Sequence, residues 1–424
     1  MTGGIERRLN EALRRVPWLR LATKRAYQTT CWLLSPKQAW TPGLAKPTQE
    51  AGEHLCGYYD KSPWDASGRR FLTLRVPRAD RHPRPGEVAE ARVVDIVGGR
   101  ARLLASTRAW NLQQGCMLQW LGPDFSRRVV FNDLIGGAYR SVLLDLASGG
   151  RRVLPMPVYA VSTDGRSALT LDFARLHRMR PGYGYGSLPD ATAGQPCPEG
   201  PCIWRLALDT GEVVPVLDYA DLLALEPRAE MAGAEHKVNH IMINPSGSRF
   251  MFLHRWVRRG TVLSRYTRLV TANLDGSGLF NLLDDDMTSH CWWRDDSHIL
   301  AYARRRGTGD GYLLLRDRTG DAHTMWPGEF ATDGHPSYSP DRRYVVTDTY
   351  PDRRRMARVI VINVETSEMR EAAHVFAPFR YDNDTRCDLH PRWSRDGRLI
   401  CFDSAHEGTR QSYIIPNPFT EGTV

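Results

Sequence analysis

The 424-residue chain has no long apolar run. No segment approaches the roughly 18 consecutive apolar residues that a transmembrane helix requires, so no membrane-spanning helix is predicted. The first 25 residues hold seven Lys or Arg and lack the apolar core of a secretory signal peptide. Export by the usual route is therefore not expected, and these absences favour a cytoplasmic protein.

Cysteine is scarce and several catalytic signatures are missing. The eight cysteines form no paired C-x-x-C motifs, which disfavours a structural zinc site. Cys197 and Cys202 are close enough to pair in an oxidising compartment, but free thiols in a reducing cytosol are the favoured interpretation. The chain has no Gly-x-Ser-x-Gly elbow, phosphate-binding loop, His-Glu-x-x-His motif or dinucleotide fingerprint. It also has no helix-turn-helix, RNP or KH pattern, so nucleic acid is not an expected partner.

Positive charge is in excess. The chain has 57 Lys and Arg against 48 Asp and Glu, which gives a formal net charge of +9. A basic surface favours an anionic partner such as an acidic poly- or oligosaccharide or an anionic membrane surface. Most of this charge is arginine, whose fork-shaped guanidinium group suits carboxylates and phosphates.

A repeat runs through most of the chain. Each copy has a short apolar segment, a tight turn similar to Ser-Pro-Asp-Gly, and a second apolar segment. The seven turn-and-strand copies lie at 65–74, 123–131, 162–171, 244–253, 294–302, 339–347 and 394–402. Several are followed by further strand-like segments around Asn, Asp and Gly turns. Seven units of four antiparallel strands predict an all-β fold, a seven-bladed β-propeller that occupies residues 46–424.

Two segments do not fit the repeat. Residues 1–45 have apolar residues at helical spacing with basic residues between them, which predicts a short basic N-terminal helix interrupted at Pro17. Two roles stay open for it: a peripheral contact with the inner membrane surface, or packing against the propeller rim. The insertion at 176–203 is rich in Gly, Pro and Tyr, and we expect it to form a loop over one face.

One histidine occupies the same register in four consecutive units, four residues before the turn begins. These are His240, His290, His335 and His390. The strand before the turn lines the central channel of a propeller, so the four imidazoles should converge at one open mouth of the channel. Convergent imidazoles predict a divalent metal site. The equivalent positions of the first three units, near Lys61, Leu118 and Val158, carry no histidine.

The strand after the turn should return to the same mouth. Its last residues, together with the position four residues before His240 and the loop that enters the last unit, supply further candidates. The predicted substrate-binding residues are His236, His254, Asp348, Tyr350, Arg386 and His406. Arg255 and Arg380 are predicted to act with the catalytic base, because two guanidinium groups can hold a carboxylate.

The histidine motifs resemble those of a known family. His240-Ile-Met-Ile-Asn-Pro, His290 before a Trp-Trp pair, and His335 before Ser-Pro-Asp are similar to the oligogalacturonate lyases, which are seven-bladed propeller polysaccharide lyases. The likeness covers roughly residues 50–415. It implies His240 as the base, and His290 and His335 as ligands of a divalent metal, usually manganese.

The rest of the family pattern does not carry over. His390 is the third metal-binding histidine by its register. The family's glutamine ligand has no counterpart shortly before His335, where Asp333 stands. This departure points to a uronate-containing glycan that need not be a pectin fragment.

The expected function is metal-assisted β-elimination. A base removes the C5 proton of a uronic acid, and a cation must offset the negative charge that develops. Two other interpretations stay open. One is a non-catalytic propeller that binds an acidic glycan or a protein partner. The other is a glycoside hydrolase that uses the carboxyl groups of Asp348 and Asp403.

Overall fold

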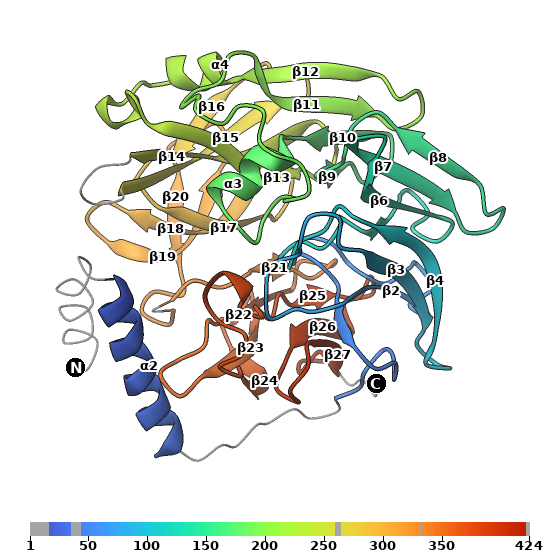
Figure 1. The fold of residues 1–424 in the computed structure, drawn as a ribbon. Helices are drawn as coiled ribbons and strands as arrows, with labels where there is room; N and C mark the ends of the chain where they lie inside the picture. The colour runs from blue at the N-terminus through green and yellow to red at the C-terminus, as the bar shows by residue number, and fades with distance from the viewer. Residues whose placement is uncertain (1–16, 35–43, 259–263, 331, 421–424) are drawn as a thin grey trace.

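Seven antiparallel sheets are arranged around a central axis (Figure 1). The computed structural model describes residues 17–34, 44–258, 264–330 and 332–420. The first strands of successive blades, among them β9, β13, β17 and β21, contact one another around the axis. The predicted seven-bladed β-propeller is confirmed.

The strands follow the chain from blade to blade. The first three blades are β1 Glu53–Leu55, β2 Arg70–Val76, β3 Ala89–Asp95, β4 Arg100–Thr107; β5 Gln119–Trp120, β6 Arg128–Ile135, β7 Ala138–Asp145, β8 Arg151–Leu154; and β9 Ala160–Val161, β10 Ser167–Thr170, β11 Pro201–Ala207, β12 Val213–Asp218. The next three are β13 Glu235–Ile243, β14 Arg249–Arg258, β15 Ser264–Asn273, β16 Phe280–Leu283; β17 Thr288–Trp293, β18 His298–Arg305, β19 Gly309–Arg316, β20 Ala322–Met325; and β21 Ser337–Tyr338, β22 Tyr344–Asp348, β23 Met356–Asn363, β24 Met369–Phe376. The last sheet is β25 Arg392–Trp393, β26 Leu399–Ser404 and β27 Gln411–Pro416.

The repeated turn is closed by its own side chains. Between β21 and β22, Ser339 Oγ donates to Asp341 Oδ1 at 2.6 Å and accepts from the N–H of Tyr344 at 3.0 Å. Ser394 makes the equivalent contacts between β25 and β26. Hydroxyl and carboxylate groups bond readily to nearby backbone in turns, so the motif fixes the angle between the first two strands of a blade.

Neighbouring blades bury their apolar faces against each other. One continuous cluster joins Val346 and Val361 of the sixth blade to Ile400 and Phe402 of the seventh, all without exposed surface. β22 is buried along its whole length. A sheet buried on both faces reads as a continuous apolar run, which explains the pattern after each turn in the sequence.

The ring closes through the chain that precedes the first blade. The last sheet has three strands, and the outer edge of β27 pairs with Ala45, whose N–H donates to the carbonyl of Ile414 at 2.9 Å. The N–H of Ile414 donates back to Ala45 at 2.8 Å. This pairing covers part of an edge that would otherwise be exposed. The division of the chain between residues 45 and 46 stays a prediction.

The short helices lie outside the blades. They are α2 Pro17–Leu33, α3 Phe173–Met179, α4 Tyr219–Ala224, and the 3₁₀ turns η2 Ala229–Met231 and η3 Asn383–Thr385. No helix in the described ranges is long and apolar enough to cross a membrane. The cysteines in these ranges, Cys197 and Cys202 included, are free.

The helix α2 packs beside the sixth blade (Figure 1). Arg25 forms an ion pair with Asp382 at 2.8 Å, and the Trp32 ring lies 6.0 Å from that of Phe376. The described helix begins at Pro17, a residue that is well tolerated in a first helical turn. The part of the predicted helix before Pro17 lies outside the described residues. Contact with a membrane stays a prediction.

The 176–203 insertion is not a loop along its whole length. It begins inside α3, whose first amides are capped by Asp172: the N–H groups of Ala174 and Arg175 donate to its Oδ1 at 2.9 and 3.0 Å. It ends inside β11. The segment between these elements buries Tyr183 and Tyr185, so it adds to the interior as well as covering a face.

Replacing Ala45 by proline tests the ring closure. Ala45→Pro removes the N–H that bonds Ile414, so we expect the free energy of unfolding to fall by about 1–3 kcal/mol. Urea denaturation measures this change. Ala45→Val keeps the N–H and should stay within about 0.5 kcal/mol of the parent. Equal stability of the proline variant and the parent would show that the ring does not depend on this pairing.

Candidate active site

The four histidines in register come together at the axis. The ring centroids of His240 and His290 lie 5.4 Å apart, those of His290 and His335 4.0 Å, and those of His335 and His390 4.3 Å. They come from four successive blades. The repeat alone positions them, since each one precedes the same turn of its blade.

The backbone is unusual at two of these histidines. His240 has φ +53° and His390 φ +45°, in the left-handed region that is costly for residues other than glycine. At His240 the pairing of β13 with β14 also slips, between Asn239 and Met242. Strained positions of this kind cluster at functional sites.

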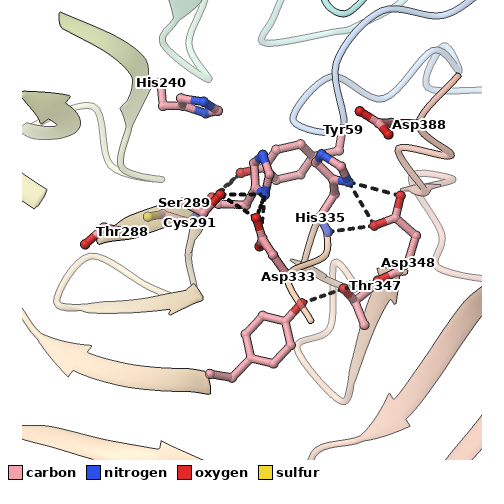
Figure 2. Close-up of polar contacts among 12 residues, drawn as sticks. Tyr59, His240, Thr288, Ser289, Cys291, Asp333, His335, Thr347, Asp348 and Asp388 are labelled. Atoms are coloured by element: carbon pink, nitrogen blue, oxygen red, sulfur yellow. Dashed lines mark hydrogen bonds and ion pairs between the residues drawn. The ribbon is translucent and has the colours of Figure 1, made fainter. Parts of the chain in front are cut away.

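Two carboxylates hold the middle histidines, the buried Asp348 and the partly exposed Asp333. His335 Nδ1 lies 2.8 Å from Asp348 Oδ1, and Asp348 also accepts from the N–H of His335 at 2.8 Å and of His390 at 3.0 Å. His290 Nδ1 lies 3.1 Å from Asp333, which also accepts from Ser289 Oγ. Figure 2 shows the contacts of these two carboxylates. Since Nδ1 is engaged in both rings, Nε2 carries their remaining ligand position.

The two carboxylates shift the pKa values of His335 and His290 to different extents. Burial lowers the pKa of His335, but the charge of Asp348 and its hydrogen bonds outweigh burial and raise that pKa above its ordinary value. Burial also lowers the pKa of His290, and there the contact with Asp333 offsets only part of the shift. The pKa of His390 is well below its usual range, because of burial first and then the charge of His335.

His335, Asp388 and His390 can hold a metal ion. One donor atom from each lies within 4.8 Å of the others. The Nε2 of His335 and both ring nitrogens of His390 are buried and have no hydrogen-bond partner. Unpartnered buried nitrogens are costly, and a cation would satisfy them, so these residues fit a divalent metal. A carboxylate such as Asp348, which accepts a hydrogen bond from the Nδ1–H of His335, is a typical partner that orients a metal-binding histidine.

This group differs from the predicted ligand set. The sequence predicted His290, His335 and His390, whereas the structure groups Asp388 with the last two. Asp388 also accepts hydrogen bonds from Arg386. The sequence carried a signal for it: Asp388 and His390 are two residues apart, and alternate residues of an extended segment share a side.

His240 is a neutral imidazole at the edge of this group. The Tyr58 hydroxyl lies 3.0 Å from its Nδ1 and 3.3 Å from its Nε2, and the His240 N–H donates to the Tyr159 hydroxyl at 3.0 Å. The pKa of His240 is well below its usual value, because burial and then the charges of Arg255 and the neighbouring histidines disfavour protonation. A neutral imidazole is able to accept a proton.

Sequence reasoning named Tyr350 but missed three other tyrosines of the site. The Tyr58 ring lies between 4.9 and 6.3 Å from all four histidine rings, and Tyr59 lies 5.4 Å from His335. Both come from the segment between β1 and β2. Tyr183 of the insertion lies 6.1 Å from both Tyr58 and His240. In the first blade, the position that aligns with the histidines is Lys61. Tyr58 lies three residues further from the turn, so the alignment did not identify it.

The site is closed rather than open. His335 and His390 have no exposed surface, and His240 is 9% exposed. The expectation of imidazoles at an open mouth is therefore wrong for this conformation. The covering rings include Tyr58, Tyr183 and, 6.0 Å from the His335 ring, Tyr350.

Three other predicted residues adjoin the cluster. Arg255 donates from Nη2 to the carbonyl of Thr288 at 3.3 Å, and its Nε is buried without a partner. The Arg386 guanidinium lies over the Tyr350 ring, 4.1 Å from its centroid. These side chains are thus beside the histidines, as the sequence predicted for the end of the second strand and the loop of the last blade.

The remaining predicted residues make other contacts. His236 Nδ1 lies 3.0 Å from His254 Nε2, and His254 Nδ1 accepts from Arg268. His406 bonds Ser404, and the half-exposed Arg380 donates to Asp80 at 2.7 Å. The structure does not bring these four residues into the histidine cluster, and a role for them in catalysis or substrate binding stays a prediction.

The carboxylates of the hydrolase interpretation are both engaged. Asp348 bonds the two histidines, while Asp403 accepts from Arg410 at 2.9 Å and from Ser412 at 2.9 Å and has no exposed surface. A glycosidase needs one carboxyl group that can be protonated as the acid. Burial raises the pKa of Asp348, but the contacts with His335 outweigh burial, lower that pKa and favour the ionised form. Asp403 is held by its ion pair with Arg410.

Comparison with solved structures gives the same fold. An oligogalacturonate lyase from Vibrio parahaemolyticus matches with a TM-score of 0.62 and 12% identity over 90% of this chain and 97% of that one. An oligogalacturonate lyase in complex with manganese matches with a TM-score of 0.60 and 15% identity over 91% and 96%. A prolyl endopeptidase matches with a TM-score of 0.50 and 10% identity over 94% of this chain and 53% of its own.

The sequence matches no protein-family model, and the comparison with curated proteins finds no match. The predicted resemblance to the oligogalacturonate lyases is confirmed at the level of the fold. Proteins of this fold include enzymes of more than one class.

Replacing Asp348 by asparagine tests the carboxylate that holds two blades together. Asp348→Asn replaces the carboxylate that accepts three hydrogen bonds by a neutral amide. We therefore expect the free energy of unfolding to fall by about 1–3 kcal/mol. Chemical denaturation measures the loss. In the exposed turn, Asp341→Asn keeps its acceptor oxygen and should change stability by less than about 0.5 kcal/mol. Similar losses in both variants would contradict the special role of Asp348.

Proposed function

We propose that the protein is a metal-assisted lyase that cleaves a uronic-acid-containing poly- or oligosaccharide by β-elimination, with His240 as the base. One arrangement carries the proposal: the buried His240 ring adjoins a histidine cluster in which His335 Nε2 and both nitrogens of His390 have no hydrogen-bond partner. The Nε of Arg255 has none either, and the lowered pKa of His240 favours its neutral form. The fold shared with oligogalacturonate lyases supports it.

The residues suit each part of the reaction. A ring nitrogen of His240 takes the proton from C5, and Tyr58 orients the ring through its hydroxyl. The electrons of the C5–H bond form the C4–C5 double bond as the C4–O4 bond breaks, and O4 leaves with a proton from an acid. The unpartnered Nε of Arg255 is suited to bind the uronate carboxylate during these steps.

His335, Asp388 and His390 would hold the metal. A divalent cation bound there would offset the charge of the uronate carboxylate and so make the C5 proton more acidic. Nitrogen and carboxylate ligands are compatible with manganese, which is the metal in one of the similar lyase structures. Manganese is accordingly the metal that we propose first.

A specific observation favours a second function. The imidazoles of His335 and His390 are unexposed in this conformation. A propeller that binds an acidic glycan or a protein without cleaving it would not need to expose them. In either function the partner is acidic. We propose a cytoplasmic location and an acidic saccharide as the partner, which the excess of Lys and Arg over Asp and Glu suits.

The first experiment assays elimination directly. Protein supplemented with Mn²⁺ is incubated with a panel of uronate-containing glycans, and ultraviolet absorbance reports the unsaturated uronate product. His240→Ala should reduce the rate by about 100-fold or more, because the base is lost. His298→Ala, at the start of β18 where the ring bonds Asp295, should keep the parental rate. Binding of an acidic glycan without any rise in absorbance would favour the second function.

Metal binding distinguishes the two ligand sets. Asp388→Asn should weaken Mn²⁺ binding by about tenfold or more, because it removes a charged ligand. His290→Ala should bind the metal as the parent does, since its ring belongs to no three-residue donor group in the described ranges. Calorimetric titration with Mn²⁺ gives both affinities. Loss of binding in His290→Ala with retention in Asp388→Asn would instead support the set predicted from sequence.

A further inference from the structure

Two cations near His240 have nitrogens without an acidic partner. Lys237 and Arg255 face each other across β13 and β14. Lys237 is 4% exposed, and its Nζ donates to the carbonyl of Met179 at the long distance of 3.5 Å. The Nε of Arg255 is buried without a partner. Within the described ranges, neither side chain forms an ion pair.

The electrostatic environment of the lysine is cationic. Burial lowers the pKa of Lys237 well below its usual value, and the charges of Arg255, Arg180 and Arg265 lower it further. Burial is also the main cause that lowers the pKa of Arg255. Arg180 is itself paired with Asp384 at 2.9 Å. Lys237 and Arg255 have no carboxylate partner in the described ranges, and two such neighbouring cations would attract an anion.

Several other buried cations of the chain have a carboxylate partner. Arg249 is paired with Asp317 at 2.6 Å, Arg355 with Asp382 at 3.0 Å, and Arg410 with Asp403 at 2.9 Å. An uncompensated buried charge costs several kcal/mol.

Arg268 is also buried without an ion pair in the described ranges, but its guanidinium donates to His254 and to the carbonyls of Leu222 and Leu225. Lys237 has neither an ion pair nor a second acceptor among the described residues, so its ammonium group is suited to an anion that the chain does not supply.

This position adjoins the candidate base. Arg255 Nη2 donates to the carbonyl of Thr288, two residues before His290, and Lys237 precedes His240 by three residues on β13. The charges of Arg255 and Lys237 also lower the pKa of His240. An anionic group bound by the two cations would therefore lie near His240.

We propose that Lys237 and Arg255 together form a binding site for the substrate carboxylate, and that Lys237 distinguishes uronates from neutral sugars. The sequence analysis predicted that Arg380 would hold the carboxylate together with Arg255. Arg380 pairs with Asp80 at the surface, and we assign this role to Lys237 instead. The identity of the anion as a uronate rests on the proposed function, whereas the unpaired cations stand without it.

The test measures binding without turnover. Galacturonate and glucuronate monosaccharides have no glycosidic oxygen at C4 to expel, so elimination cannot consume them. Their affinities for the full-length protein are measured by calorimetry or NMR titration, with galactose and glucose as neutral counterparts. Lys237→Met keeps the length of the side chain without its charge. Lys46→Met is the matched control, because Lys46 pairs with Glu407 outside the site.

We expect the parent to prefer uronates, and Lys237→Met to lose about tenfold or more of that affinity, the effect of one charge-assisted hydrogen bond. Binding of neutral sugars and the thermal midpoint should not fall, since an unpaired buried charge has been removed. Lys46→Met should bind as the parent does. The proposal is overturned if the parent binds uronates no better than neutral sugars, or if Lys237→Met keeps the preference.

The same variants separate this inference from the proposed function. Lys237-dependent uronate binding without unsaturated product from any glycan would retain the anion site and reject the lyase. Product formation with the same KM in Lys237→Met and the parent would retain the lyase and reject the anion site. A lower thermal midpoint with equal loss of uronate and neutral-sugar binding would make Lys237 a structural residue and reject its selective role.

Discussion

One buried carboxylate, Asp348, sets the geometry on which the candidate site depends. It ends β22 and accepts hydrogen bonds from the ring and amide of His335 and from the amide of His390. It therefore joins the sixth and seventh blades at two of the three candidate metal ligands, two residues before β21 and β25 begin. Its charge is sustained by these donors: burial raises the pKa of Asp348, and the contacts with His335 more than offset that effect.

The closed cover of the site is held by weaker contacts than the site itself. Arg180 of the insertion pairs with Asp384 of η3 at 2.9 Å, but both side chains are a third or more exposed. Ion pairs with that exposure contribute about 1 kcal/mol or less. Below them, His335 and His390 are held by the buried carboxylate of Asp348, whereas His290 is held by the partly exposed Asp333. The contact between the insertion and η3 is therefore weaker than the contacts that hold His335 and His390.

The sequence determined the parts of this structure that repeat. The turn motif gave seven blades, and register placed His240, His290, His335 and His390 around one axis, because the same local contacts recur in each blade. The features that it missed come from non-repeating segments. Tyr58 and Tyr183 reach the histidines from a connection and an insertion, and no local pattern encodes such distant contacts.

The metal ligands show a similar limit. The sequence could name Asp388 only as a neighbour of His390, and the family resemblance favoured His290 in its place. Burial also was not predicted. Whether an imidazole at the end of an inner strand is exposed depends on which rings cover it, and here these rings are contributed by three separate segments.

The closure of the ring has a consequence for biosynthesis. Ala45 leaves the ribosome before the first blade, and its partner Ile414 belongs to β27, the last strand in the described ranges. The blade that carries Asp388 and His390 thus obtains its outermost contact only after all seven blades have been translated. The candidate metal site would therefore assemble after synthesis, and a chain that stalls after the sixth blade would carry His240 and His335 without the ligands that complete the group.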